Sequence, residues 1–208
     1  MVARFNGADI PAVLRGRYAQ THARLGLSVP DVRYVTNRAS GNFWHLGLIK
    51  LLFPHAPVLH VIRHPLDIML SVFSQDRRME ANAHASMAAA ARHYALTMEM
   101  VKHYRGQLTL RYMPVRYEDL VAEPLPTLRR VLEFIGVEDA RLTDEAALRT
   151  NAAPRRDPTP GHYAVREPLH ARGRYRHLEY RARLPDLFAE VQEILQPWID
   201  ELGYGDAP

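Results

Sequence analysis

The sequence contains no cysteine among its 208 residues. Disulfide bridges and thiolate metal sites are therefore excluded, and a reducing compartment is permitted. The chain also lacks a long apolar run, because the stretch FWHLGLIKLLF is short and is interrupted by His45 and Lys50. The N-terminal residues lack the uninterrupted apolar segment of a signal peptide. We therefore expect a soluble, cytoplasmic protein with no membrane partner.

The charge balance is only mildly one-sided. The formal net charge is +4, and 47% of the residues are hydrophobic and 24% are charged. These fractions are ordinary for a globular protein, so disorder is not expected. The positive charge suits an anionic ligand, although it is too small by itself to indicate nucleic acid. The length is sufficient for one sizeable α/β domain, or at a stretch for two small ones, and we expect a single domain that covers residues 1–208.

Helical and strand patterns alternate along the chain. Helical patterns occupy residues 8–26, 41–54, 65–75, 85–106, 125–136 and 184–205. Strand patterns occur at 32–36, at 57–62 and near 108–117, where Pro114 favours an interruption. Residues 150–182 are rich in proline, arginine and glycine and are predicted to be irregular. The alternation predicts a three-layer α/β fold with a mainly parallel sheet flanked by helices, in which residues 57–62 form an inner strand.

The last of these helical patterns has a clear apolar stripe. Its members are Leu187, Val191, Ile194, Leu195 and Trp198. Such a stripe predicts that this helix packs against the core.

The stretch RHPLDIMLS, which follows the apolar run VLHVI, contains the main candidate site. Pro65 suits the first turn of a helix, where free backbone N–H groups favour an anion. Arg63 leaves the preceding strand at the edge where parallel sheets bind ligands, and its forked guanidinium suits a phosphate. Asp67 and Ser71 are four residues apart and so share one helix face. The spacing leaves a second interpretation open, in which Asp67 caps the helix and Arg63 is its ion-pair partner.

Four motifs in order resemble those of the sulfotransferase family. They are YVTNRASGNFWHLGLI, RHPLDIMLS, VRYEDLV and AVREPLHARGRY. The family patterns that they resemble are FVTDKxPGNFxHLGLI, RDPxDxxxS, VRYEDLV and QVRxPxYxxxxGRW. The similarity runs from about Val32 to Trp198 and is greatest to bacterial members linked to tetratricopeptide repeats and to tyrosylprotein sulfotransferases. No single motif is decisive, but their common order is specific.

This resemblance implies a fold, a donor and a reaction. The fold is the P-loop-like sulfotransferase fold. The donor is 3′-phosphoadenosine 5′-phosphosulfate (PAPS), the product is 3′-phosphoadenosine 5′-phosphate (PAP), and no metal is required. The acceptor is a hydroxyl group on a small molecule, a glycan or a peptide tyrosine, and the short motifs do not identify it.

The resemblance also implies roles for individual residues. Arg63 and Ser71 match the ligands of the 3′-phosphate, and Tyr117 matches the tyrosine on the adenine side. Arg174 matches a basic residue beyond the late nucleotide loop, whose matching residues are Val165, Arg166 and Pro168. Arg38 stands where the family more often has lysine and is the candidate catalytic residue at the leaving phosphate bridge. Without the resemblance, the preferred interpretation of Tyr117 is an ordinary strand aromatic. The arginine-rich loop by itself would be interpreted as a solvated surface.

The sequence departs from the family pattern near its beginning. Asn37 and Ser40 replace an aspartate and a proline of the family segment that contains Arg38. In the family, a serine- and glycine-rich loop supplies backbone N–H groups to the 5′-phosphosulfate. Nothing in residues 1–31 resembles this loop or the general base that follows it. The sequence therefore predicts a domain without its first strand and donor loop, which binds the nucleotide but transfers sulfate poorly.

The residues give less support to three other functions. The eleven histidines match no H-E-x-x-H or similar metal spacing, and no G-x-x-x-x-G-K-[ST] motif of a P-loop kinase occurs. A basic module that binds a nucleotide or nucleic acid without catalysis is the alternative. The arginines on which it rests are Arg155, Arg156, Arg166, Arg172, Arg174, Arg176, Arg181 and Arg183. They lack the interleaved aromatic residues of an RNA-binding surface, so nucleic acid is not the expected ligand.

Overall fold

The computed structural model describes residues 4–5, 8–26, 34–74, 86–138 and 170–205. The chain divides into two compact units, each considered by itself: residues 1–56 with 99–111, and residues 57–98 with 112–208. Helix α4 (Met87–Gln107) and strand β4 (Arg111–Arg116) have residues in both units. The expectation of a single domain over residues 1–208 stays a prediction.

The first unit begins with a short antiparallel pair, β1 (Arg4–Phe5) and β2 (Ala8–Asp9), which leads directly into α1 (Ile10–Arg24). Asp9 caps this helix, since its side chain accepts a hydrogen bond from Ala12 N at 3.2 Å. The 3₁₀-helix η1 (Ser40–His45) and α2 (Leu46–Leu52) follow, and α2 packs against α1. The helical patterns at 8–26 and 41–54 are therefore confirmed.

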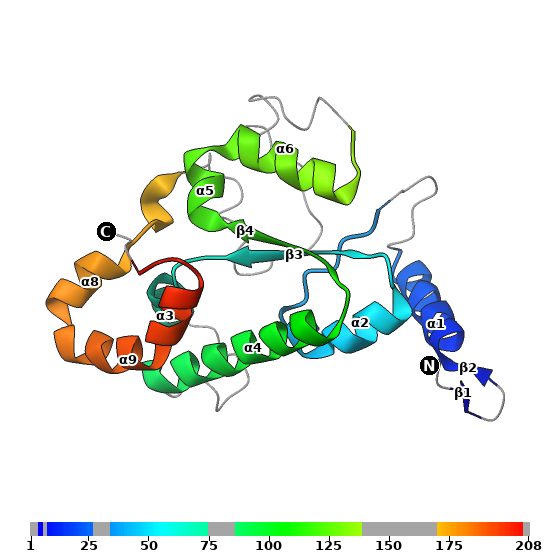
Figure 1. The fold of residues 1–208 in the computed structure, drawn as a ribbon, viewed down its shortest axis with the longest axis horizontal. Coiled ribbons are helices and arrows are strands. Elements are labelled where there is room, and N and C mark those ends of the chain that lie inside the picture. The colour runs from blue at the N-terminus through cyan, green and yellow to red at the C-terminus, as the bar shows by residue number, and fades with distance from the viewer. Residues whose placement is uncertain (1–3, 6–7, 27–33, 75–85, 139–169, 206–208) are drawn as a thin grey trace. The chain divides into compact units, whose positions relative to one another are not determined.

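The second unit contains a two-stranded sheet and most of the helices. Strand β3 (Pro57–Ile62) lies parallel to β4, with both arrows pointing the same way in Figure 1. Helix α3 (Pro65–Ser74) follows β3, and α5 (Tyr117–Ala122) and α6 (Pro124–Ile135) follow β4. The C-terminal part consists of η4 (Ala171–Gly173), α8 (His177–Arg183) and α9 (Pro185–Glu201). These alternating elements confirm the α/β class.

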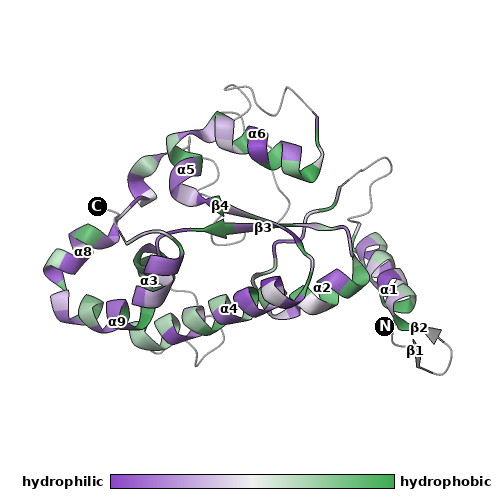
Figure 2. Cartoon of the chain, viewed as in Figure 1, coloured by the Kyte–Doolittle hydropathy of each residue, from purple (hydrophilic) through white to green (hydrophobic). Residues whose placement is uncertain are grey.

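The core of this unit lies between α3, α4 and α9. Hydrophobic and hydrophilic residues are interspersed along α9 (Figure 2), and Phe188, Val191 and Leu195 are at most 1% exposed. They pack with Leu66 and Met69 of α3 and with small residues of α4. The predicted stripe of α9 is thus correct for Val191, Leu195 and Trp198, and its other two members, Leu187 and Ile194, are partly buried against the same core. It omitted Phe188, which is among the most deeply buried residues of the helix.

Three predictions of local structure were wrong. Residues 34–36 are not in a strand, and 32–33 lie outside the described residues. Pro114 does not interrupt β4, which pairs on one side only in the described two-stranded sheet, and edge strands tolerate proline. Helix α8 begins inside the segment predicted to be irregular and continues to Arg183.

The inner position predicted for β3 also does not match the described sheet. Within the described residues β3 pairs with β4 alone. Leu59 and Val61 are 40% and 61% exposed, so one face of the strand is open. The wider three-layer arrangement stays a prediction.

Candidate functional site

The carboxyl ends of β3 and β4 bring two predicted site residues together. Arg63 directly follows β3, and Tyr117 directly follows β4. Because the strands are parallel, both residues leave the same edge of the sheet. The Cζ atom of Arg63 lies 5.0 Å from the centroid of the Tyr117 ring, within the range of a cation–π contact.

The guanidinium of Arg63 has two further partners. Its Nη2 atom lies 3.3 Å from Oδ2 of Asp67, one turn into α3, and donates a hydrogen bond to the carbonyl of Gly173. The ion pair of the second interpretation is therefore present. It uses only part of the guanidinium, because Nε of Arg63 is buried without a hydrogen-bond partner. Since buried donors are rarely left unpaired, this atom is a candidate contact for a ligand.

The first turn of α3 does not offer free amides, contrary to our expectation. Pro65 has no N–H group, and Leu66 N donates to Nδ1 of His64 at 3.2 Å. Asp67 N and Ile68 N donate to the carbonyl of His64 at 2.9 and 3.1 Å. The backbone N–H groups of this turn already have partners at the start of the helix. An anion at this edge would therefore have to be bound by side chains.

Asp67 connects α3 to the C-terminal part of the unit. Its Oδ1 atom accepts hydrogen bonds from both N and Nδ1 of His177, at 2.8 and 2.9 Å. Asp67 thus supplies a carboxylate to the N-terminus of α8, which explains why this short helix forms where the sequence predicts none. Burial by itself raises the pKa of Asp67, but the bonds from His177 and the charge of Arg63 outweigh it, so the pKa is lowered overall.

A cluster of buried polar residues surrounds this contact, and we call it the polar cluster. It consists of His64, Asp67, Glu118, His177 and Tyr204, each at most 4% exposed. The rings of His64 and His177 are stacked, with centroids 4.0 Å apart and planes at 16°. Glu118 accepts from His64 N at 3.0 Å and from the Tyr204 hydroxyl at 2.7 Å. The cluster therefore joins four separate segments beneath Arg63.

Burial also controls the acid–base properties of the polar cluster. It lowers the pKa of His64 to about 4, and His177, Arg116 and Arg63 act in the same direction, whereas Asp67 opposes them. Burial and the hydrogen bond to Glu118 raise the pKa of Tyr204. His64 is consequently neutral at pH 7, and Tyr204 remains a hydrogen-bond donor.

Arg116, the last residue of β4, holds the chain near Tyr204. Its Cζ atom lies 4.0 Å from the centroid of the Tyr204 ring, and its Nη1 and Nη2 atoms donate to the carbonyl of Gly203 at 3.4 and 3.3 Å. This side chain therefore fastens the residues after α9 to the same edge of the sheet as Arg63.

Residues 170–177 cover Arg63 and Tyr117. Gly173 accepts from Arg63, and a Cβ atom at this glycine would lie only 3.1 Å from Cζ of Tyr117. Tyr175 has a φ of 51°, a left-handed backbone that is rare for aromatic residues. Arg174 is exposed, with Cζ 5.8 Å from the Tyr175 ring centroid. The segment thus places Arg174 near the edge that Arg63 occupies.

The other predicted site residues are described by their position in the fold and their exposure, or lie outside the described residues. Ser71 is half-buried on α3, one turn beyond Asp67. Arg38 is exposed and belongs to the first unit. Asn37, beside it, accepts hydrogen bonds from Ala39 N and Asn42 Nδ2 at 3.0 and 3.2 Å, which gives asparagine a local role at the start of η1. Val165, Arg166 and Pro168 lie outside the described residues.

Comparison with known families decides the assignment. The model of the sulfotransferase family matches residues 9–141. This chain belongs to the sulfotransferase family. The matched span of the sulfotransferase domain includes Arg38, Arg63, Ser71 and Tyr117 and ends before Arg174. The resemblance to particular subfamilies stays a prediction.

One curated relative of this sulfotransferase-family chain comes from Aquifex aeolicus (strain VF5) and is described as an uncharacterized protein. It is 30% identical over 110 residues, which cover 48% of the present chain and 14% of the relative. The sulfotransferase-family chain therefore spans a small part of the relative's length.

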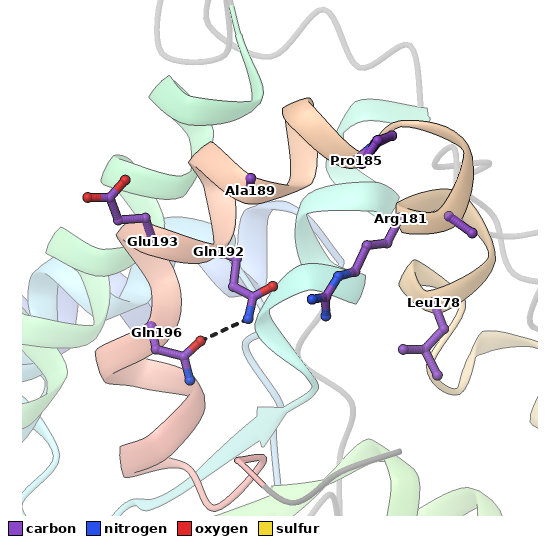
Figure 3. A pocket seen from close by; sticks show the side chains of 8 residues that line it. Leu178, Arg181, Pro185, Ala189, Gln192, Glu193 and Gln196 are labelled. Atoms are coloured by element: carbon purple, nitrogen blue, oxygen red, sulfur yellow. Dashed lines mark hydrogen bonds between the residues drawn. The ribbon is translucent and has the colours of Figure 1, made fainter.

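A separate groove lies along α8 and α9, with a volume of about 880 Å³. Its lining includes Leu178, Arg181 and Pro185, and the hydrogen bond from Gln192 to Gln196 crosses one wall (Figure 3). None of the predicted site residues lines it, so it is not part of the site around Arg63.

Two further kinds of feature are absent from the described residues. Among them, no group of three or more histidine, aspartate or glutamate side chains is arranged to hold a metal ion. None of the helices in the described ranges has the length and hydrophobicity needed to cross a bilayer.

Sequence reasoning missed most of the polar cluster. His177 stands in an arginine-rich stretch. Tyr204 falls inside the helical pattern predicted for 184–205, but it is not part of the apolar stripe and lies beyond the end of α9 at Glu201. Glu118 was visible in the motif VRYEDLV, but its burial depends on partners 54 and 86 residues away. The one available signal was a carboxylate directly after a predicted strand, at the edge where ligands bind.

Proposed function

We propose that this chain is a sulfotransferase that binds PAPS and transfers its sulfuryl group to an acceptor hydroxyl. Family membership supports a transferase. The observation that carries the donor assignment is the position of Arg63, at the carboxyl end of a parallel strand with its Nε atom buried and unpaired. Ligands of α/β sheets bind at this edge, and a guanidinium edge with a free donor fits a phosphate.

The neighbours of Arg63 support a 3′-phosphate site. Ser71 lies on the same face of α3 as Asp67 and offers a hydroxyl donor. Tyr117 provides an aromatic ring beside this phosphate position for the adenine side of the donor. Arg174 adds an exposed positive charge next to the segment that contacts Arg63. These four residues are the proposed nucleotide ligands among those described.

The remaining assignments rest on the resemblance alone. Val165, Arg166 and Pro168 are proposed to fold over the nucleotide, and Arg38 to stabilise charge on the bridging oxygen. In the reaction, the bond from sulfur to the 5′-phosphate oxygen breaks and a bond from sulfur to the acceptor oxygen forms, while the acceptor hydroxyl loses its proton. A cation at the bridge acts on the charge that develops during this step.

Calorimetric titration with PAP and with 5′-AMP tests the donor assignment. We expect PAP to bind more tightly, because each charge-assisted bond to the 3′-phosphate contributes about 1.5–3 kcal/mol, or roughly 10- to 100-fold in affinity. Arg63→Ala should reduce PAP affinity and leave 5′-AMP binding unchanged. Equal affinity of the wild type for the two nucleotides would falsify the proposal.

A second titration separates the proposal from the nucleic-acid alternative. A single-stranded oligonucleotide should bind weakly, and its affinity should fall steeply with salt, whereas PAP affinity should depend less on salt. Transfer is then assayed with labelled PAPS and a panel of phenols, sugars and tyrosine peptides. Salt-sensitive oligonucleotide binding stronger than PAP binding would favour the basic binding module.

A further inference from the structure

We propose that His177 is a positioning residue, which acts through Asp67 to hold the guanidinium of Arg63 in the orientation that binds the 3′-phosphate. This inference rests on the proposed function of Arg63. His177 lies at the first turn of α8, and Asp67 lies on α3, which packs against α8 in the same unit (Figure 1).

The contacts form a chain of three side chains. Both hydrogen bonds from His177 end on Oδ1 of Asp67, at 2.8 Å from N and 2.9 Å from Nδ1. The other oxygen, Oδ2, lies 3.3 Å from Nη2 of Arg63. Since one oxygen is held from two directions, the carboxylate cannot rotate freely, and its second oxygen is fixed toward Arg63.

The proton on the His177 ring is determined by its surroundings. A bond from Nδ1 to a carboxylate requires hydrogen on Nδ1. The stacked ring of His64 accepts from Leu66 N through its own Nδ1, so this neutral ring carries its hydrogen on Nε2. The stack, with centroids 4.0 Å apart, holds the His177 ring in the plane that reaches Asp67.

Substitution of the ring separates positioning from helix capping. The bond from the backbone N of residue 177 to Asp67 does not depend on the side chain, so α8 keeps its carboxylate cap in any variant except proline. Only the bond from Nδ1 is lost. A change in nucleotide binding after substitution of the His177 side chain therefore reports the loss of its hydrogen bond to Asp67 rather than the loss of α8.

The ligand provides the specific readout. Arg63 is proposed to contact the 3′-phosphate, which PAP has and 5′-AMP lacks. A misoriented Arg63 should weaken PAP binding and spare 5′-AMP binding. Loss of an outer hydrogen-bond partner costs about 10- to 100-fold at metal sites, and we expect roughly a tenfold loss for PAP here.

The experiment compares two substitutions of opposite design in the full chain. His177→Phe keeps an aromatic ring for the stack but removes the donor, and His177→Asn removes the ring but keeps an N–H near the position of Nδ1. We expect His177→Phe to lose most of the preference for PAP over 5′-AMP and His177→Asn to keep it. His103→Phe, at an exposed histidine of α4, is the matched control. If His177→Phe does not fold, as judged by circular dichroism, His177→Gln replaces it, because its amide is displaced by one bond.

Each outcome decides the inference. Loss of PAP preference in the donor-free variant and its retention in His177→Asn support it. An unchanged preference in the donor-free variant overturns it, as does an equal loss of affinity for both nucleotides, which would indicate a structural role. A wild type without preference for PAP overturns the proposed function itself, and the inference with it. A wild-type preference that survives in every variant overturns the inference alone.

Discussion

Gly173 lies against Tyr117 so closely that no side chain fits between them. A Cβ atom at residue 173 would be 3.1 Å from Cζ of Tyr117 and 3.3 Å from Cε1. Gly173 does not have a positive φ, so the requirement for glycine arises from space and not from backbone conformation. The same residue accepts the hydrogen bond from Arg63. The contact therefore couples the covering segment to both proposed nucleotide ligands.

We expect Gly173→Ala to displace either Tyr117 or residues 170–177. Overpacking of this kind costs about 1–3 kcal/mol in the free energy of unfolding. This displacement should also move Arg63 and Tyr117, so PAP affinity should fall as well. Urea unfolding and calorimetric titration measure the two effects. Gly16→Ala is the control, since no atom outside the adjoining backbone of α1 lies within 4 Å of its Cβ position and alanine there should stabilise by about 0.5–1 kcal/mol. Normal stability of Gly173→Ala would contradict this contact.

The free energy of unfolding should depend on pH through His64. Below pH 6.5 the unfolded chain protonates this histidine, whereas burial keeps it neutral in the folded chain down to about pH 4. The unfolded state then binds more protons, so stability rises with pH from about 4 to 6.5 and His64 adds no further dependence above that. The difference in pKa corresponds to at most about 3 kcal/mol.

His64→Asn tests this pH dependence. Asparagine can still accept from Leu66 N but does not titrate. Urea unfolding between pH 4.5 and 7.5 should therefore give a flatter profile for the variant than for the wild type. Parallel profiles would show that another group controls stability in this range.

Tyr204→Phe should destabilise the second unit by removing one donor from the polar cluster. The phenylalanine ring still lies beneath Arg116, but one oxygen of the buried Glu118 loses its partner. Such a loss costs about 1–3 kcal/mol. A double-mutant cycle with Glu118→Ala, which removes both carboxylate oxygens, measures the coupling between the two side chains by chemical denaturation. Strict additivity of the two substitutions would mean that the bond contributes nothing.

Phe188→Ala should be the most destabilising of these changes. Phe188 is 1% exposed and packs between α3 and α4, so its truncation leaves a cavity that costs about 3–5 kcal/mol. Leu96→Ala is the matched control, because Leu96 is 54% exposed and should change stability by no more than about 0.5 kcal/mol. Thermal unfolding distinguishes them, and similar melting temperatures would argue against the core as described.

Local signals predicted much of the second unit. The apolar run ending at Ile62, the helix after Pro65 and the end of α6 at Gly136 are all encoded nearby, and Gly136 takes the left-handed backbone that helix ends favour. The position of Arg63 at a strand end was predictable for the same reason. These features depend on neighbours within a few residues.

Tertiary partners determined the features that the sequence did not predict. Helix α8 has only seven residues and depends on Asp67 for its N-terminus. The amides at the start of α3 were predicted to be free, but the ring of His64 turns back onto Leu66 N. The polar cluster is formed by residues that no periodic pattern connects. Local pattern cannot supply such contacts, because each one depends on the folded arrangement of distant segments.

The polar cluster also constrains the order of folding. Its hydrogen bonds join residues separated by 54, 86 and 110 positions in the chain. Contacts of such long range form only after the intervening loops have closed, which makes them late events. Because Arg63 is proposed to depend on this cluster for its orientation, a partly folded chain in which only α3 and α4 have formed should lack the proposed phosphate site. Bound nucleotide should therefore slow the unfolding of the folded chain. Nucleotide added during refolding should leave the rates of the early folding phases unchanged.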